Sequence, residues 1–95
     1  MDDLLELMRT EQAEELRLHV GSPPVTVLHG DSHTVEGPAI TAEDAEHFLL
    51  SITNTRQRRQ IRERGWAQFF YMFRGATRFL ILARIEDENV GFDIR

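Results

Sequence analysis

The stretch that most constrains the fold runs from Glu15 to Gly30 and reads ELRLHVGSPPVTVLHG. Two runs of alternating apolar residues, 16–20 and 25–27, flank the sequence Gly-Ser-Pro-Pro. Alternation with a period of two indicates strands that each bury one face. Glycine allows a positive φ, whereas each proline holds φ at about −65° and has no N–H group. We therefore predict two strands joined by a stiff corner rather than by a hairpin.

Outside this stretch, residues 1–65 predict three helices and one short strand. An apolar stripe predicts a helix over residues 2–12, and a strand over 33–36 is expected to pair back on 25–29 after a tight turn at Gly30. Thr41, with Asp44 three residues on, is the candidate N-cap of a helix in which Phe48 and Ile52 fall at helical spacing. Asn54 or Thr55 is expected to begin a second short helix, 56–64, which ends at Gly65.

The C-terminal half predicts three strands. Residues 66–74 and 77–85 alternate in hydrophobicity around a short connector, which favours a hairpin, and residues 90–95 follow as a last strand. The element order is α-β-β-(β)-α-α-β-β-β. It indicates one α+β domain over residues 1–95, an antiparallel sheet with its helices mainly on one face.

Composition excludes several classes of function. The net charge of −5 disfavours a nucleic-acid-binding domain, and the absence of cysteine excludes thiol chemistry and fits a cytoplasmic location. No apolar run is long enough for membrane insertion, and the acidic N-terminus does not resemble a signal peptide. There is no phosphate-binding loop and no nucleophile motif. A metal site would need His29 and His33 to face each other, and that spacing is unspecific. We expect no catalytic residue, no cofactor and no metal ion.

Two groups of residues are candidates for partner binding. Five arginines fall within nine residues, 56–64, and spread around the predicted helix. They form either a solvated surface paired with nearby acids or a docking surface for an acidic partner or a nucleotide phosphate. The strand that follows is dense in aromatic residues, and one of its faces is an interface candidate if no helix covers it. The partner-binding candidates are Arg58, Arg59, Arg62, Trp66, Phe70 and Met72.

The order of several short motifs resembles the N-terminal, PAS-like domain of PilT-like pilus retraction ATPases and, more loosely, of type II secretion ATPases. The matching features are A-E-E-L-R-L at 13–18, G-x-P-P at 21–24, Gly30, Ile40-Thr41, Gln57, Phe69, G-x-x-R-F at 75–79, and Phe92. The resemblance covers nearly the whole chain and implies a PAS-like sheet. The resemblance does not include the motor domain of that family, so it implies no ATPase activity for these residues.

The chain departs from that family at polar positions. Arg17 replaces a histidine of the family, Val27 an arginine and Gln68 an acid. Leu80 and Leu82 replace an arginine and an asparagine. Asp93 replaces an arginine that lies near the nucleotide in the family. An acid would repel a phosphate.

We therefore expect a non-catalytic protein-interaction or regulatory module of pilus or secretion systems, whose partner is a pilus or secretion ATPase or a second copy of the chain. The alternatives are a PAS-like small-ligand sensor, which needs a closed apolar cavity, or the N-terminal part of a longer secretion ATPase.

Overall fold

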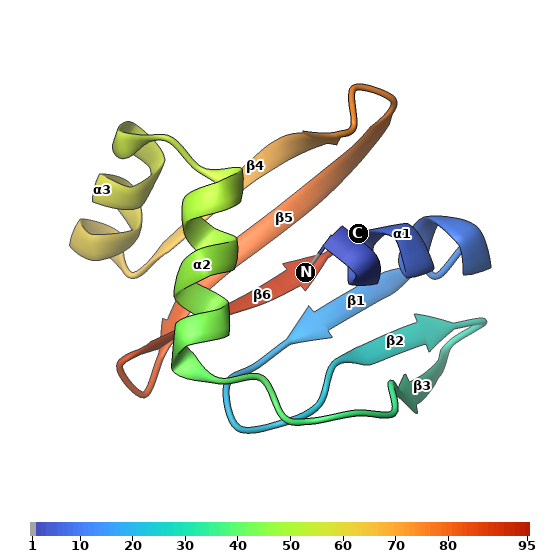
Figure 1. Cartoon of the computed structure of the whole chain (residues 1–95). Helices are drawn as coiled ribbons and strands as arrows, with labels where there is room; N and C mark the ends of the chain where they lie inside the picture. Colours follow the sequence, from blue (N-terminus) through green and yellow to red (C-terminus); the bar gives the residue numbers. More distant parts are fainter. Residues whose placement is uncertain (1) are drawn as a thin grey trace.

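One six-stranded antiparallel sheet, with strand order β3-β2-β1-β6-β5-β4, forms the frame of the fold (Figure 1). The structure is a computed structural model and describes residues 2–95. Its helices are α1 (Asp2–Glu11), α2 (Ala42–Ile52) and α3 (Thr55–Arg64). Its strands are β1 (Glu15–Leu18), β2 (Val25–Leu28), β3 (Asp31–Thr34), β4 (Trp66–Phe73), β5 (Thr77–Glu86) and β6 (Asn89–Ile94). The predicted α+β class and element order are confirmed.

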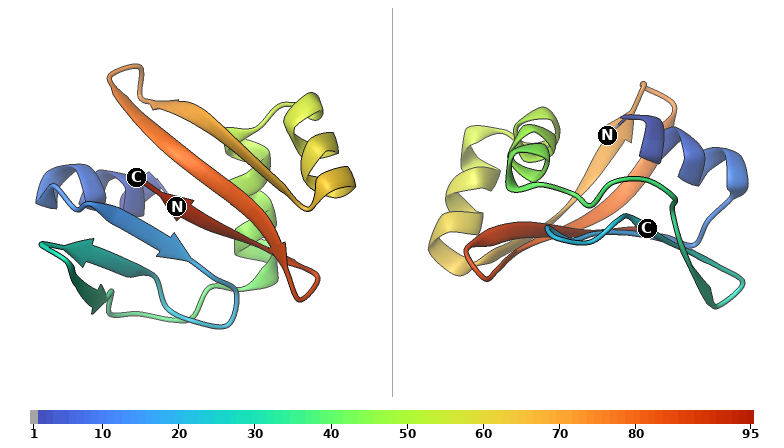
Figure 2. Two further views of the ribbon diagram at one scale, coloured as in Figure 1. Left: turned by 180° about the vertical axis from the view of Figure 1, so that it is seen from behind. Right: turned by 60° about the horizontal axis from the view of Figure 1, so that its bottom comes forward.

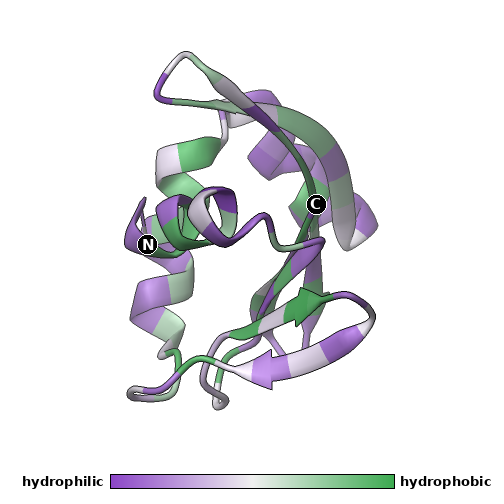
Figure 3. Cartoon of the chain, turned by 90° about the vertical axis from the view of Figure 1, so that its right-hand side faces the viewer, coloured by the Kyte–Doolittle hydropathy of each residue, from purple (hydrophilic) through white to green (hydrophobic). Residues whose placement is uncertain are grey.

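All three helices lie on the same side of the sheet, and the opposite side carries no element of residues 2–95 (Figure 2). The core lies between the helices and the sheet. At its centre the ring of Phe48, from α2, meets the ring of Phe92, from β6, edge to face at a centroid distance of 4.8 Å. Leu5, Leu16 and Ile94 are completely buried beside them. Helix α3 is hydrophilic along almost its whole surface (Figure 3) and buries only Ile61.

The helix ends follow the local sequence signals. Thr41 accepts a hydrogen bond from the Asp44 N–H, and the Asp44 carboxylate accepts one from the Thr41 N–H. Asn54 and Gln57 form the same reciprocal pair at the start of α3. Gly65 ends α3 with φ at +86°, and its N–H donates to the carbonyl of Ile61. Both predicted caps and the terminal glycine are confirmed.

The predicted corner between β1 and β2 is partly wrong. These strands are antiparallel neighbours, with Arg17 opposite Val25, so the chain turns back on itself as in a wide hairpin. The prolines do not prevent pairing because they precede the first ladder residue, Val25. The corner is held from outside: the Gly21 N–H donates to the carbonyl of Ile40 at 2.8 Å.

The β2–β3 turn also differs from the prediction. His29, with φ at +52°, and Gly30, with φ at +82°, form a two-residue turn, and β3 pairs with β2 from Asp31 onward. The predicted strand at 33–36 therefore begins two residues earlier and ends at Thr34. Its four residues are all exposed, so no apolar alternation marked where it begins.

Candidate binding surface

The uncovered side of the sheet, called here the open face, is built from alternate residues of the strands. The β4–β5 register places Trp66 opposite Arg84, Phe70 opposite Leu80 and Met72 opposite Arg78. The neighbours of these residues along each strand point to the core. That alternation is why the predicted core residues Phe73, Phe79, Ile81 and Ala83 are all buried.

An apolar patch lies along β4 on the open face. Trp66 is 46% exposed, Phe70 60% and Met72 52%. Leu80 and Leu82 of β5 lie beside this patch and are half-buried. The guanidinium group of Arg78 lies over the Phe70 ring, 4.3 Å from its centroid, so one edge of the patch carries a positive charge. The sequence made an interface here conditional on a strand face that no helix covers. Trp66, Phe70 and Met72 do lie exposed on one face of β4.

A cluster of charged side chains lies next to the patch. Nη1 of Arg84 is 2.9 Å from Oδ2 of Asp93, and Nδ1 of His19 is 2.8 Å from Oε1 of Glu86. These residues come from β6, from β5 and from the segment after β1, and they surround Gly91. A Cβ atom at Gly91 would lie 2.1 Å from Oε1 of Glu86, so the absence of a side chain there makes room for the carboxylate.

This cluster could not be predicted from the sequence, because its members come from distant segments: His19 and Glu86 alone are 67 residues apart. The only local signal was that His19 follows Arg17 by two residues and so shares its face of the sheet. Arg84 pairs with Asp93, the acid that stands where the family has an arginine.

One cross-strand row contains four of the family departures. Arg17 lies opposite Asp93, Asp93 opposite Leu82, and Leu82 opposite Gln68. Leu80 lies opposite Phe70 on the same face. Val27 lies opposite Glu15, two residues along β1 from Arg17, and therefore also points to this face. The positions at which the chain departs from the family it resembles thus share the open face.

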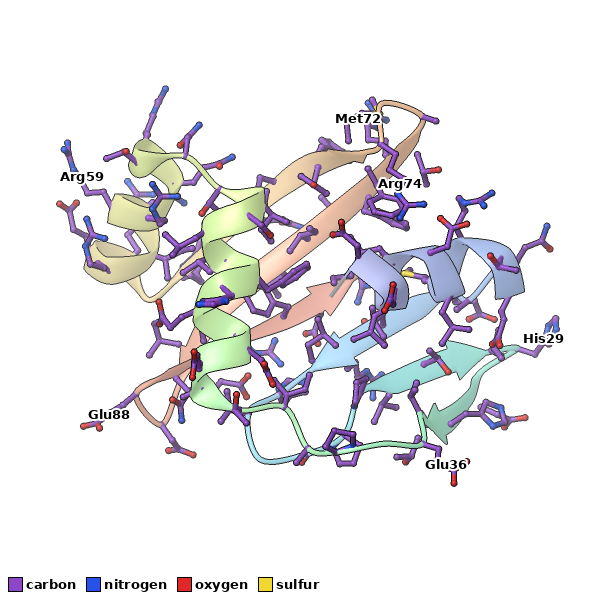
Figure 4. All side chains as sticks on the ribbon, viewed as in Figure 1. His29, Glu36, Arg59, Met72, Arg74 and Glu88 are labelled. Carbon is purple, nitrogen blue, oxygen red and sulfur yellow. The ribbon has the colours of Figure 1, made fainter. Side chains whose placement is uncertain are left out.

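The arginines of α3 divide into two groups. Arg58 is half-buried, and its Nη1 donates to the carbonyl of Thr53 at 2.6 Å and to the Thr53 hydroxyl at 3.1 Å. That contact gives Arg58 a structural role at the C-terminal end of α2. Arg59 and Arg62 are exposed, and Arg59 points away from the fold (Figure 4). Among residues 2–95, the ion pairs include none with an α3 arginine, so the acids considered as their partners do not engage them.

The two candidate groups do not form one continuous face. Helix α3 lies on the helix-covered side of the sheet, whereas Trp66, Phe70 and Met72 point to the open face. The groups adjoin only at β4, which begins directly after Gly65. A partner that contacts both would have to reach around the β4 edge of the sheet.

Buried side chains such as Phe48, Ile52 and Phe92 pack together between the sheet and the helices. The hollow of about 330 Å³ beside the α1 N-terminus lies outside the core and is lined by residues such as Leu4, Pro24 and Pro38. Within residues 2–95 no group of three His, Cys, Asp or Glu side chains could hold a metal ion. None of the helices described has the length and apolar character needed to cross a membrane.

Comparison with known proteins gives matches to solved structures. No protein-family model and no curated protein sequence matches the chain. The pilus retraction motor PilT, solved with bound ADP, superposes on the whole chain with a TM-score of 0.89 at 22% sequence identity. The fold is that of the N-terminal domain of PilT.

Two further matches are DotB ATPases. The Legionella pneumophila protein superposes on the whole chain with a TM-score of 0.82 at 17% identity, and the Yersinia pseudotuberculosis protein on 98% of it with a TM-score of 0.69 at 12% identity. The chain spans about 28% of the length of PilT and 27% of that of Legionella DotB. The resemblance inferred from the sequence motifs is therefore confirmed at the level of the fold.

Proposed function

We propose that the chain is a non-catalytic, cytoplasmic interaction module that binds a pilus or secretion ATPase and adjusts its activity in twitching motility or secretion. PilT is a pilus retraction motor and DotB is an ATPase. The shared fold makes an ATPase of this group the partner to test. The role itself rests on the site, since a fold alone does not specify a function.

The observation that carries the proposal is the exposed patch of Trp66, Phe70 and Met72. Aromatic residues and methionine are enriched at protein interfaces, and a tryptophan at the centre of an interface often dominates its binding energy. A soluble domain rarely leaves adjacent large apolar side chains half-exposed without a use for them. Arg78, beside the patch, would supply part of its polar rim, and Arg59, on α3 at the other side of the sheet, would supply electrostatic steering.

The changed chemistry of the open face supports a protein partner over a nucleotide. Leu80 and Leu82 provide apolar contacts where the family it resembles has an arginine and an asparagine. Asp93 adds a carboxylate, which disfavours a phosphate nearby even when paired with Arg84. The surface kept its scaffold, and Val27, Leu80 and Leu82 place apolar side chains where the family has polar ones, as expected of a module that contacts a motor without serving its nucleotide cycle.

The test is a binding measurement with variants on each candidate surface. A pilus retraction or secretion ATPase from the source organism, purified as its oligomer, is immobilised, and the affinity of the chain is measured by interferometry. We expect Phe70→Ser to weaken binding at least tenfold. Leu50→Ser is the matched control, because Leu50 is 57% exposed on α2 and lies away from the open face.

The arginine contribution needs its own pair of variants. Arg59→Gln with Arg62→Gln is compared with Arg56→Gln with Arg64→Gln, which removes the same charge from the same exposed helix. A selective loss in the first pair places Arg59 and Arg62 in the contact. Equal losses of affinity in both pairs would mean that α3 contributes only general electrostatic steering. Unchanged affinity in both pairs would mean that α3 does not take part in binding. Unchanged affinity for Phe70→Ser would contradict the proposal itself.

A further inference from the structure

The β4 strand forms one outer edge of the sheet, and its outward backbone groups belong to the residues of the exposed patch. The Ile85 N–H donates to the carbonyl of Gly65 at 2.8 Å, which sets the pattern of the β4–β5 ladder. In an antiparallel pair the bonding residues alternate, so Ala67, Phe69 and Tyr71 bond to β5. The N–H and C=O groups of Trp66, Gln68, Phe70 and Met72 therefore point away from the sheet.

The two edges of the sheet are built differently. The β3 edge is four residues long, wholly polar, and includes Asp31 and His33. Short length and charged residues are the usual means by which an edge strand avoids pairing with another chain. The β4 edge is eight residues long, reads WAQFFYMF, and contains neither a charge nor a proline. It has none of that protection.

Two residues on the core side of β4 are incompletely covered. Phe69 and Tyr71 pack against the core cluster but remain half-buried. Their counterparts one strand further in, Ile81 and Phe79, are 0% and 5% exposed. The deficit lies at the edge of the sheet, where one more strand would complete the burial of both rings.

We propose that β4 pairs antiparallel with β4 of a second copy, so that two chains form one continuous sheet. A two-fold axis at Phe69 places Trp66 opposite Met72 and Gln68 opposite Phe70 of the second copy. On the core side it places the small Ala67 opposite Tyr71, and Phe69 opposite itself. This register joins outward-pointing residues in the hydrogen-bonded positions, as an antiparallel ladder requires.

The second copy is favoured over another partner because the strand is complementary to itself. In the Phe69 register tryptophan faces methionine, tyrosine faces the small alanine, and the two Phe69 rings face each other across the axis. Such aromatic cross-strand pairs stabilise a sheet, and methionine sulfur makes favourable contacts with aromatic rings. The strand carries no charge, so two chains that each have a net charge of −5 bring no like charges into direct opposition there.

This inference concerns the same strand as the proposed function but leaves that function separately testable. Pairing uses the backbone edge, so the side chains of Trp66, Phe70 and Met72 stay on the open face. The open faces of the two copies would form one continuous surface across the two-fold axis. The chain can therefore bind the ATPase even if it does not dimerise, and it can dimerise even if it does not bind the ATPase.

The first experiment measures the mass of the chain by sedimentation velocity from low to high micromolar concentration. We expect a reversible dimer. Gln68→Pro removes an outward N–H group without disturbing the β4–β5 ladder, and Gln68→Ala, which keeps that N–H, is its control. The proline variant is expected to be monomeric and the alanine variant dimeric, with circular dichroism confirming that both fold. A wild-type monomer at every concentration, or a dimer that survives Gln68→Pro, overturns the proposal.

The second experiment tests the register and uses the absence of cysteine in the chain. In the proposed register Phe69→Cys places two thiols in a directly opposed, non-hydrogen-bonded pair, with Cα atoms about 4.5 Å apart, within reach of a disulfide. Phe70→Cys is more exposed, but its two copies are offset along the strands. We expect mild oxidation to cross-link Phe69→Cys much faster than Phe70→Cys. Faster cross-linking of Phe70→Cys would overturn the register.

Discussion

Nδ1 of His19 lies 2.8 Å from Oε1 of Glu86, and the pair crosses the bare backbone of Gly91. Gly91→Ala would place a Cβ atom 2.1 Å from that carboxylate oxygen, so the flexible end of Glu86 must move away. We expect the free energy of unfolding to change by less than about 1 kcal/mol, because the Glu86 carboxylate can turn away into solvent and alanine restricts the unfolded chain more than glycine does. The His19 ring resonances in an NMR spectrum should shift clearly.

Gly75→Ala is the control for that substitution. Gly75 has φ at +67° in the β4–β5 connector, a conformation that an alanine adopts only with strain. It should cost more stability than Gly91→Ala, about 1–2 kcal/mol, and leave His19 unaffected. A larger loss of stability for Gly91→Ala than for Gly75→Ala would contradict the expectation that only side-chain ends, chiefly the Glu86 carboxylate, have to move.

The Thr41 hydroxyl should stabilise the start of α2. It accepts a hydrogen bond from the Asp44 N–H at 3.0 Å, and Thr41→Ala leaves that donor to solvent. Loss of an N-cap of this kind costs about 1 kcal/mol, which chemical denaturation can measure. Thr41→Ser keeps the acceptor and should retain most of the stability. Equal losses for the two variants would show that the hydroxyl does not act as the cap.

Asp44 should make part of the stability depend on pH. Hydrogen bonds from the Thr41 backbone and then from its side chain lower the pKa of Asp44 below its ordinary value. The folded state therefore favours the charged carboxylate. This contribution is present above the unfolded-state pKa and disappears as the pH falls through the folded-state pKa. Asp44→Asn should be less stable than wild type at neutral pH and should lose less stability on acidification; parallel pH profiles would contradict this.

Core and surface phenylalanines should differ sharply in their effect on stability. Phe92 is 1% exposed and packs edge to face on Phe48, so Phe92→Ala should cost about 3–5 kcal/mol. Phe70 is 60% exposed, and Phe70→Ala should cost less than about 1 kcal/mol. Denaturant unfolding of both variants checks this. A large cost for Phe70→Ala would mean that the patch stabilises the monomer rather than serving a partner.

Nucleotides should not stabilise the chain by itself. The core is filled around Phe48 and Phe92, and the open face presents the carboxylates of Asp93 and Glu86. Millimolar ATP or ADP should leave the melting temperature unchanged, because only a ligand that binds the folded state raises it. A clear rise in thermal-shift measurements would favour the small-ligand sensor hypothesis over the interaction module.

The local features of this fold could be predicted from the sequence because their causes are local. Period-two alternation assigned Phe73 to the core and Phe70 to the other face of β4, and the helix caps followed from residues three positions apart. Pairings between distant segments could not be predicted in this way. The position of β6 between β1 and β5 brings Asp93 beside Arg84 and Arg17, and nothing near residue 93 in the sequence indicates that. The contact of Arg58 with Thr53 depends on how α3 packs against α2, so its structural role was also hidden.

The most direct test of the proposed function is an NMR titration of the isotopically labelled chain with the oligomeric pilus or secretion ATPase of its source organism. The account predicts that signals from the open face, above all the Trp66 indole and the amides of Phe70, Met72 and Leu80, broaden or shift first. Signals from β3 and from the exposed side of α2 around Leu50 should change little. Perturbations confined to the helix-covered side, or none at saturating ATPase, would contradict the assignment of the open face as the partner-binding surface.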